Sequence, residues 1–435
     1  MRKITTRAVS VLLLAAAIVV GLTVYVLRYI DEGRSWALAF SRVNSGSYGS
    51  LLDRNGVKLA YFDGERSEYA DDSYTRIANY HVTGDYEGRS GSGVLNTFWG
   101  NMQGFSLLTG TTKAEASVLT LSVDSELNRV AYNAINGRKA AVLVCDYTSG
   151  DVLCMVSTPS IDPADPDAVP AEGAYINRCL SAAFTPGSVF KLVTAAAAIE
   201  SIPDIFERSF YCEGYYEVAG VPITDLAAHY TQSFEQALAN SCNIAFAQIA
   251  IKVGQNTLLQ HVRDYGFLDK HELSGIPTAA GNFPSDFVGD PELGWAGIGQ
   301  STDLVCPYSL LRFVSAVGNS GVLCEPRLLL DGSAPKLSRF MNAETAQRLT
   351  EMMNYTVVQH YGGEDSFPGL RLCAKTGTAE RGDGSSNAWF AGFLNDPAHP
   401  YAFVVMVEQA GFGITDAAPI ARAVLTAAVN KYPMH

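Results

Sequence analysis

The chain has 435 residues, 48% of them apolar, and a net charge of −13. These values exclude a disordered chain and allow two domains with a large buried core. The sequence contains no concentrated basic block, so nucleic acid is not expected as a partner, because phosphate binding needs such a surface.

The N-terminal segment has the length and composition of a membrane-spanning helix. Residues 8–27 form an apolar run interrupted by Ser10, Gly21 and Thr23, and a helix of this length spans about 30 Å, the hydrocarbon thickness of a bilayer. Three basic residues precede the run, so we expect a cytoplasmic N-terminus and an exported remainder. A cleaved signal peptide is the alternative, but its apolar region is usually only about 7–15 residues long. An uncleaved, single-pass anchor within residues 1–30 is therefore favoured.

Residues 31–115 predict a small, loop-rich stalk domain. The segment is rich in Gly, Ser, Asp and Tyr and shows no sustained period. Asn55-Gly56 lies between apolar positions and indicates a β-hairpin turn. More regular patterns begin at about residue 116, so we expect a second, larger domain over residues 116–435.

The larger domain has strand patterns near both of its ends and helical patterns in the middle. A helix is predicted to open at residues 124–127, after an alternating strand over 117–123. The sequence further predicts strands at 140–145, 152–156, 370–377, 387–394 and 401–408, and helices at 191–200, 233–240, 244–253 and 416–431. This order indicates an α/β fold, in which the two ends of the domain close one sheet and a helical subdomain stands to one side.

The eight cysteines are irregularly spaced, with no Cys-x-x-Cys and no Cys/His pattern of zinc spacing. We therefore expect neither a metal site nor a cofactor. If Ser149-Gly150 forms a two-residue turn, Cys145 and Cys154 face each other across a hairpin. Most cysteines lie in apolar surroundings, where a free thiol behaves as a small hydrophobic group, so free thiols are favoured over disulfides.

Three short motifs occur in order: Ser-Val-Phe-Lys at 188–191, Ser-Cys-Asn at 241–243 and Lys-Thr-Gly at 375–377. Each pattern is weak alone, because 333–336 is also Ser-x-x-Lys and 385–387 is also Ser-x-Asn. The local context separates them, since the serine at 333 precedes a proline-containing loop, whereas the serine at 188 follows Pro-Gly and precedes a helical pattern. The three motifs together indicate a serine nucleophile with a lysine base.

The chemistry requires these residue types. Ser188 is expected to open a helix with its hydroxyl at the positive end of the dipole, and Lys191 lies on the same helical face. A serine attacks only when a base takes its proton, and a lysine is a base only if desolvation or a second cation lowers its pKa. Lys375 can be that second cation, while Ser241 can relay a proton. The alternative, a helix cap with a solvated lysine, does not account for the other two motifs.

Longer segments around these motifs resemble the class B penicillin-binding proteins. The resemblance is carried by Phe-Thr-Pro-Gly-Ser-Val-Phe-Lys at 184–191, Ala-Leu-Ala-Asn-Ser-Cys-Asn at 237–243, Lys-Thr-Gly-Thr-Ala-Glu at 375–380, Asn-Ala-Trp-Phe-Ala-Gly-Phe at 387–393 and Asp-Arg-Asn-Gly at 53–56. It implies the penicillin-binding transpeptidase fold, an antiparallel sheet flanked by helices. It also implies a serine D,D-transpeptidase that cross-links peptidoglycan stem peptides ending in D-Ala-D-Ala and is acylated by β-lactam antibiotics.

The resemblance assigns a role to each motif residue. It implies that Ser188 attacks the substrate carbonyl, with Lys191 as general base assisted by Ser241, and that Lys375 supplies positive potential. The implied binding residues are Asn243 for the substrate amide backbone, Thr376 and Thr378 for its carboxylate, Gly377 for close approach of an extended peptide, and the backbone N–H groups of Ser188 and Thr378 for the oxyanion.

Residues 31–115 are too few for a glycosyltransferase. The resemblance therefore implies a membrane partner of the SEDS glycosyltransferase family, met through the transmembrane helix and stalk; small residues such as Gly21 allow close helix approach. A class A β-lactamase is disfavoured, since no Glu-x-x-Leu-Asn lies between the second and third motifs. A D,D-carboxypeptidase and a catalytically quiet β-lactam-binding scaffold remain as alternatives.

Overall fold

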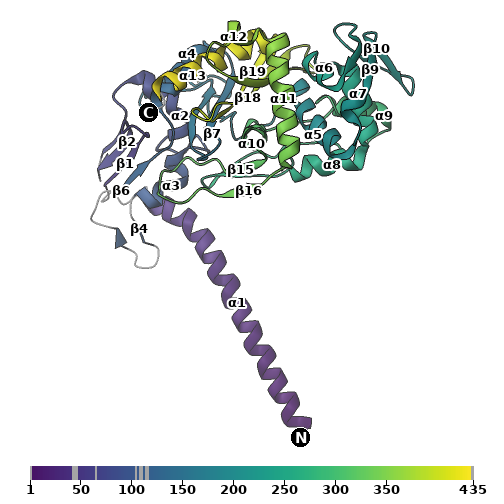
Figure 1. The fold of residues 1–435 in the computed structure, drawn as a ribbon. Helices are drawn as coiled ribbons and strands as arrows, with labels where there is room; N and C mark the ends of the chain where they lie inside the picture. The colour runs from purple at the N-terminus through teal and green to yellow at the C-terminus, as the bar shows by residue number, and fades with distance from the viewer. Residues whose placement is uncertain are drawn as a thin grey trace.

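The computed structural model describes residues 2–41, 48–63, 66–102, 105–106, 111–112 and 117–432. A long helix, α1 (Arg2–Ser41), projects away from the rest of the molecule (Figure 1). Its segment Val9–Arg28 is long and apolar enough to cross a membrane, and it coincides within a residue with the apolar run read from the sequence.

A small sheet follows α1 and has the strand order β3-β2-β1-β6. Its strands are β1 (Tyr48–Leu52), β2 (Lys58–Asp63), β3 (Arg66–Tyr69) and β6 (Ser117–Thr120). The turn between β1 and β2 contains Gly56 at φ 82°, which confirms the hairpin predicted from Asn55-Gly56. β6 pairs in parallel with β1, so segments on both sides of residue 116 share this sheet.

The region before residue 116 is more regular than the loop-rich stalk expected from composition. It holds α2 (Ser73–Thr83), α3 (Val94–Met102) and the two-residue strands β4 (Phe105–Ser106) and β5 (Thr111–Thr112). Asp53 joins this region to the larger domain: one carboxylate oxygen accepts the N–H groups of Asn55 and Val57, and the other accepts the N–H and hydroxyl of Ser125. The Asp-Arg-Asn-Gly segment therefore has a structural reason to contain aspartate.

The larger domain is built on an antiparallel sheet with the order β17-β18-β19-β7-β8. The strands are β7 (Ala140–Asp146), β8 (Val152–Thr158), β17 (Leu372–Glu380), β18 (Ser386–Leu394) and β19 (Tyr401–Ala410). Because β19 pairs with β7, the two ends of the domain close one sheet, as predicted. One face packs on α4 (Ser125–Ile135) and α13 (Ala418–Lys431), and the other on the helical subdomain.

The helical subdomain lies to one side of this sheet (Figure 1). Its helices are α5 (Lys191–Ser201), α6 (Phe234–Ala239), α7 (Asn243–Val253), α8 (Gln255–Asp264), α9 (Asp290–Ala296) and α11 (Ala343–His360). Helix α10 (Pro307–Gly318) packs against the sheet itself, and the short α12 (Gly363–Ser366) follows α11. Four short antiparallel strand pairs lie in the same part of the chain. β9 (Ser209–Cys212) pairs with β12 (Tyr230–Ser233), and β10 (Tyr215–Val218) pairs with β11 (Val221–Thr224). β13 (Glu272–Leu273) pairs with β14 (Ile276–Pro277), and β15 (Val322–Cys324) pairs with β16 (Leu337–Arg339).

The predicted juxtaposition of Cys145 and Cys154 is wrong. A bulge after Val144 shifts the register, so Cys154 lies opposite Val144 and Cys145 lies opposite Val152. Cys145 consequently packs on the side of the helical subdomain, while Cys154 packs beneath α4 and α13. All eight cysteines lie in the described part of the chain and all are free.

Candidate active site

Ser188 lies in a 3-10 turn, Gly187–Phe190, that leads directly into α5. The sequence predicted that Ser188 opens the α-helix itself, whereas the helix begins three residues later at Lys191. Ser188 still precedes the N-terminus of α5, where the helix dipole favours negative charge on its oxygen. Its side chain is half-buried and faces a cleft.

The turn that carries Ser188 is held between two backbone segments. Gly187 has φ 56°, and a Cβ built there would lie 2.6 Å from the carbonyl oxygen of Thr378 on β17. On its other side, Gly187 N–H donates to the Gly299 carbonyl at 2.8 Å. A glycine at 187 is therefore required both by the left-handed backbone and by the close approach of β17.

Lys191 is fully buried, and its ammonium nitrogen joins the first two motifs. Nζ lies 3.0 Å from Ser188 Oγ, 3.3 Å from Ser241 Oγ and 2.7 Å from Asn243 Oδ1, and it also donates to the Ser241 carbonyl. Burial lowers the pKa of Lys191 to about 8, against the opposing effect of the acidic groups of Asp225 and Cys242. A neutral amine is thus accessible near neutral pH, within hydrogen-bonding distance of the serine.

Lys375 is also fully buried, and its amine approaches the Ser241 hydroxyl from the side opposite to Lys191. Its Nζ donates to Ser241 Oγ at 2.9 Å and to the Thr376 carbonyl at 3.0 Å. Burial lowers the pKa of Lys375 strongly, and repulsion from Lys191 lowers it further. The two amines are thus linked through Ser241, and the state in which both are protonated is disfavoured. Burial is what lowers the pKa of Lys191, whereas Lys375 has its pKa lowered both by burial and by Lys191.

The second motif lies in the turn between α6 and α7. Ser241 adopts φ 55°, a left-handed conformation that costs a non-glycine residue about 1–3 kcal/mol unless its surroundings hold it there. Cys242 is the N-cap of α7, and Asn243 is its first residue. This kink directs both Ser241 Oγ and Asn243 Oδ1 toward the amine of Lys191.

The third motif lies on β17, which is the edge strand of the central sheet on this side. A Cβ built at Gly377 would lie 2.8 Å from the Pro186 carbonyl and 3.0 Å from Val189. Glycine here lets the Ser188 turn pack onto the strand, a different reason from the peptide approach implied by the resemblance. Thr376 and Thr378 both line the cleft beside Ser188.

The first decoy pattern lies apart from this site, whereas the second lies at the edge of the cleft. Ser333 and Lys336 are exposed in a loop between short strands, and Arg327 binds the Ser333 carbonyl there. Ser386 begins β18 and lines the cleft, but Asn387 is buried within that strand. The structure therefore brings the three predicted motifs together and leaves Ser333 and Lys336 outside them.

The cleft in front of Ser188 has a volume of about 1050 Å³, and all three motifs contribute to its lining. At this cleft, Ser188 lies beside the buried amine of Lys191, and the amine of Lys375 lies behind it. The hydroxyl groups of Thr376 and Thr378 lie along the edge strand β17. The nucleophile Ser188 and the relay Ser241 each lie within hydrogen-bonding distance of the base Lys191, an arrangement that suits covalent acyl transfer.

The structure adds residues that sequence reasoning did not assign. Tyr361 OH lies 2.8 Å from Thr376 Oγ1 and accepts the Thr376 N–H at 3.0 Å. Trp389 is fully buried and donates from its indole nitrogen to the Thr185 carbonyl, next to the Ser188 turn. The Gly299 carbonyl accepts the N–H of Gly187. None of the three carries a local pattern that predicts these long-range contacts.

The chain is similar to known proteins over most of its length. The family model described as penicillin binding protein transpeptidase domain matches residues 140–426. Peptidoglycan D,D-transpeptidase PbpA of Mycobacterium tuberculosis is 28% identical over 347 residues, which cover 68% of each protein. Stage V sporulation protein D of Bacillus subtilis is 27% identical over 336 residues, covering 69% of this chain and 52% of the relative.

Solved structures share the fold. Penicillin-binding protein A from M. tuberculosis, as its ceftriaxone acyl-enzyme complex, superposes with a TM-score of 0.74 at 24% identity, covering 88% of this chain and 99% of that one. Pseudomonas aeruginosa PBP2 in complex with WCK 5153 superposes with a TM-score of 0.74 at 23% identity, covering 89% and 97%.

Proposed function

The chain belongs to the class B penicillin-binding proteins and is a serine D,D-transpeptidase, and from this premise we propose which residues carry the reaction. Ser188 is the acylated residue, Lys191 is its general base, and Ser241 with Lys375 forms the proton relay. The substrate is a peptidoglycan stem peptide that ends in D-Ala-D-Ala. The observation that supports this assignment best is the 3.0 Å distance from the buried Lys191 amine to Ser188 Oγ.

In the acylation step, Ser188 Oγ attacks the carbonyl carbon of the penultimate D-Ala while its proton passes to Lys191 Nζ. The backbone N–H groups of Ser188 and Thr378 bind the oxyanion, an interaction whose loss typically lowers turnover about 100- to 1000-fold. Collapse breaks the peptide C–N bond. The leaving D-Ala amine takes a proton through Ser241, and an ester remains on Ser188.

In the second step, an amine from a neighbouring stem peptide attacks the ester carbonyl. Lys191 takes the proton of that amine, the C–O bond to Ser188 breaks, and the serine recovers a proton. Asn243 binds the donor's amide backbone, while the hydroxyls of Thr376 and Thr378 bind its terminal carboxylate during the first step. β-Lactams enter the same path, but their acyl-enzyme persists.

The nucleophile is tested with fluorescent penicillin on the detergent-extracted chain. Ser188→Ala should abolish covalent labelling, whereas Ser333→Ala, the matched decoy variant, should label like the unaltered protein. Labelling of the Ser188 variant, or an adduct mapped to Ser333, would refute the assignment.

We further propose that α1 anchors the protein with its N-terminus in the cytoplasm and its catalytic domain outside. The protein then works beside a membrane glycosyltransferase of the SEDS family, because residues 31–115 are too few for a glycan polymerase. Small residues in the span, such as Gly21, support a helix–helix contact with it. Replacing Val9–Arg28 by an unrelated span of equal length should abolish co-purification; undiminished co-purification would remove the helix from the interface.

A further inference from the structure

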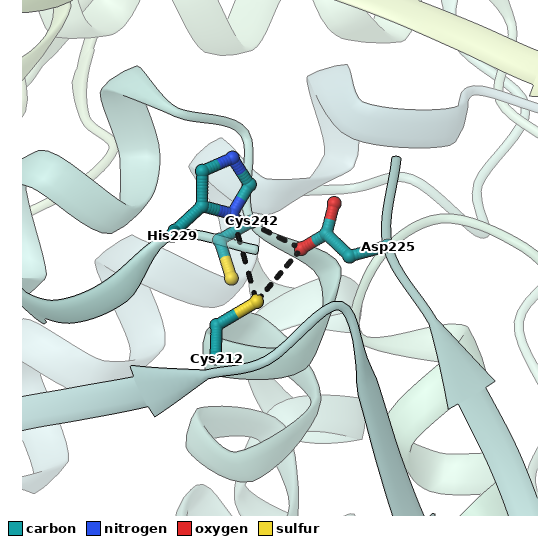
Figure 2. A group of neighbouring side chains, drawn as sticks. All are labelled: Cys212, Asp225, His229 and Cys242. Atoms are coloured by element: carbon teal, nitrogen blue, oxygen red, sulfur yellow. Dashed lines mark hydrogen bonds and ion pairs between the residues drawn. The ribbon is translucent and has the colours of Figure 1, made fainter. Parts of the chain in front are cut away.

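Four side chains that are scattered in sequence converge at the rim of the cleft. Cys212 ends β9, Asp225 follows β11, His229 precedes β12, and Cys242 caps α7. Figure 2 shows the two sulfur atoms, a carboxylate oxygen and a ring nitrogen directed toward one another. Their ligand-type atoms all lie within 4.8 Å of one another.

The distances fit a tetrahedral ion. Cys212 Sγ lies 3.7 Å from Asp225 Oδ2 and 3.6 Å from His229 Nδ1, and these last two atoms are 3.5 Å apart. Ligands placed tetrahedrally at zinc bond lengths of about 2.0–2.3 Å are separated by about 3.3–3.8 Å. Three of the four ligand atoms are therefore already spaced for one ion, and Cys242 Sγ lies within 4.8 Å of each of them.

Burial and hydrogen bonding also favour a cation. Both cysteines are fully buried, and the Asp225 side chain is only 4% exposed. Cys212 Sγ accepts the N–H of Gly214 and Cys242 Sγ that of Ala245, each at 3.4 Å, as expected for thiolate ligands. Within the described residues, Asp225 forms an ion pair with His229 and with no lysine or arginine. A buried carboxylate beside two sulfur atoms therefore lacks a permanent positive charge, which a bound cation would supply.

We propose that Cys212, Asp225, His229 and Cys242 bind one Zn²⁺ as a closed structural site. Two thiolates and an imidazole suit zinc, and four protein ligands leave no open position for a reacting water. The sequence spacing predicted no metal site because the ligands come from four separate segments, two of which become neighbours only when β9 pairs with β12.

The ion would secure the hairpin β10–β11 to the catalytic second motif. The hairpin otherwise rests on a small apolar cluster of Val218, Ile223 and Ala247. Cys242 is flanked by Ser241 and Asn243, so a bond to its sulfur fixes the strained turn between them.

Asn243 is tied to the same hairpin. Its backbone N–H donates to Asp225 Oδ2 at 2.8 Å, and its side-chain amide donates to the Thr224 carbonyl at 3.0 Å. Ligation of Asp225 therefore positions Asn243, and Asn243 in turn holds the amine of Lys191. The four ligands are positioning residues, not catalytic ones.

Metal content is measured on the full chain, extracted in detergent without chelator and without a metal-binding tag. Plasma mass spectrometry should find about one zinc per chain. Replacement by Co²⁺ should give thiolate charge-transfer absorption and intense visible bands of tetrahedral cobalt. An unaltered protein that carries no zinc and gives no such cobalt spectrum overturns the proposal, as does a mass two hydrogens lighter with Cys212 and Cys242 joined in a disulfide.

Conservative variants separate ligation from general damage. Asp225→Asn and His229→Gln should each lower zinc affinity about 10-fold or more, whereas Cys154→Ala, a buried cysteine outside the cluster, should keep full occupancy. If a ligand variant does not fold, the cobalt spectrum of the unaltered chain still decides. Zinc retained at full affinity by both variants would contradict the proposed ligand set.

Loss of zinc should also increase hydrogen exchange in residues 213–229 and slow β-lactam acylation, with both effects reversed by Zn²⁺ but not by Mg²⁺. Unchanged exchange there after verified zinc removal would overturn the positioning role. Metal content is measured independently of acylation, so an inactive but zinc-loaded protein would refute the proposed function while leaving the metal site intact.

Discussion

The rate of acylation should depend on pH through Lys191. Its pKa is lowered to about 8 by burial, so about one tenth of the amine is neutral at pH 7 and about nine tenths at pH 9. Because only the neutral amine takes the serine proton, the second-order rate constant should rise about tenfold above pH 7 and level off beyond pH 9. An unshifted lysine would give a far larger rise that continues past pH 10.

The assay is stopped-flow acylation by a chromogenic β-lactam, corrected at each pH for spontaneous β-lactam hydrolysis, with folding checked by circular dichroism. Lys336→Ala, which alters only the decoy lysine, should reproduce the profile. Lys191→Ala should lower the rate about 10²- to 10⁴-fold and remove this titration. A profile that is flat across this range, or centred near the ordinary lysine pKa, would refute the assignment of Lys191 as the base.

Three other changes have defined outcomes. Gly187→Ala should cost about 1–3 kcal/mol in the free energy of unfolding, because φ is 56° and the new Cβ meets the Thr378 carbonyl; a melting temperature equal to that of the unaltered protein would contradict this. Tyr361→Phe removes hydrogen bonds to Thr376, worth about 0.5–1.5 kcal/mol, so donor binding should weaken several-fold while the limiting acylation rate changes less. The mature protein should retain Val9–Arg28 and extract only with detergent; a soluble form beginning after this segment would show a cleaved signal.

Local sequence predicted most strands and helices because their boundaries are set by residues close in the chain. The Asn55-Gly56 hairpin, the helix after Asp124, and the strand that carries the Lys375 motif with the two strands after it depend on turn residues and on hydrophobic period. Whether Cys145 and Cys154 lie opposite each other depends on the pairing register of β7 and β8, which local sequence does not set. A single bulge places the two cysteines on opposite faces of the sheet.

The site was predictable where one short segment carries several functions, as at residues 188–191. It was not predictable where function depends on contacts across the fold. Tyr361 meets Thr376 from the end of α11, and Gly299 accepts the N–H of Gly187 although the two are far apart in sequence. The cluster of Cys212, Asp225, His229 and Cys242 escaped the spacing rules for the same reason, since those rules describe ligands that are close in sequence.

The central claim is that Ser188 carries a peptidyl ester that an amine then resolves. The most direct measurement incubates the detergent-extracted chain with a stem-peptide donor ending in D-Ala-D-Ala and an amine acceptor, and follows enzyme and products by mass spectrometry. We predict a donor adduct on Ser188, release of D-Ala, and a cross-linked product that exceeds the hydrolysed one and is absent with Ser188→Ala. Hydrolysed product alone would indicate a carboxypeptidase, and product formed without Ser188 would contradict the account.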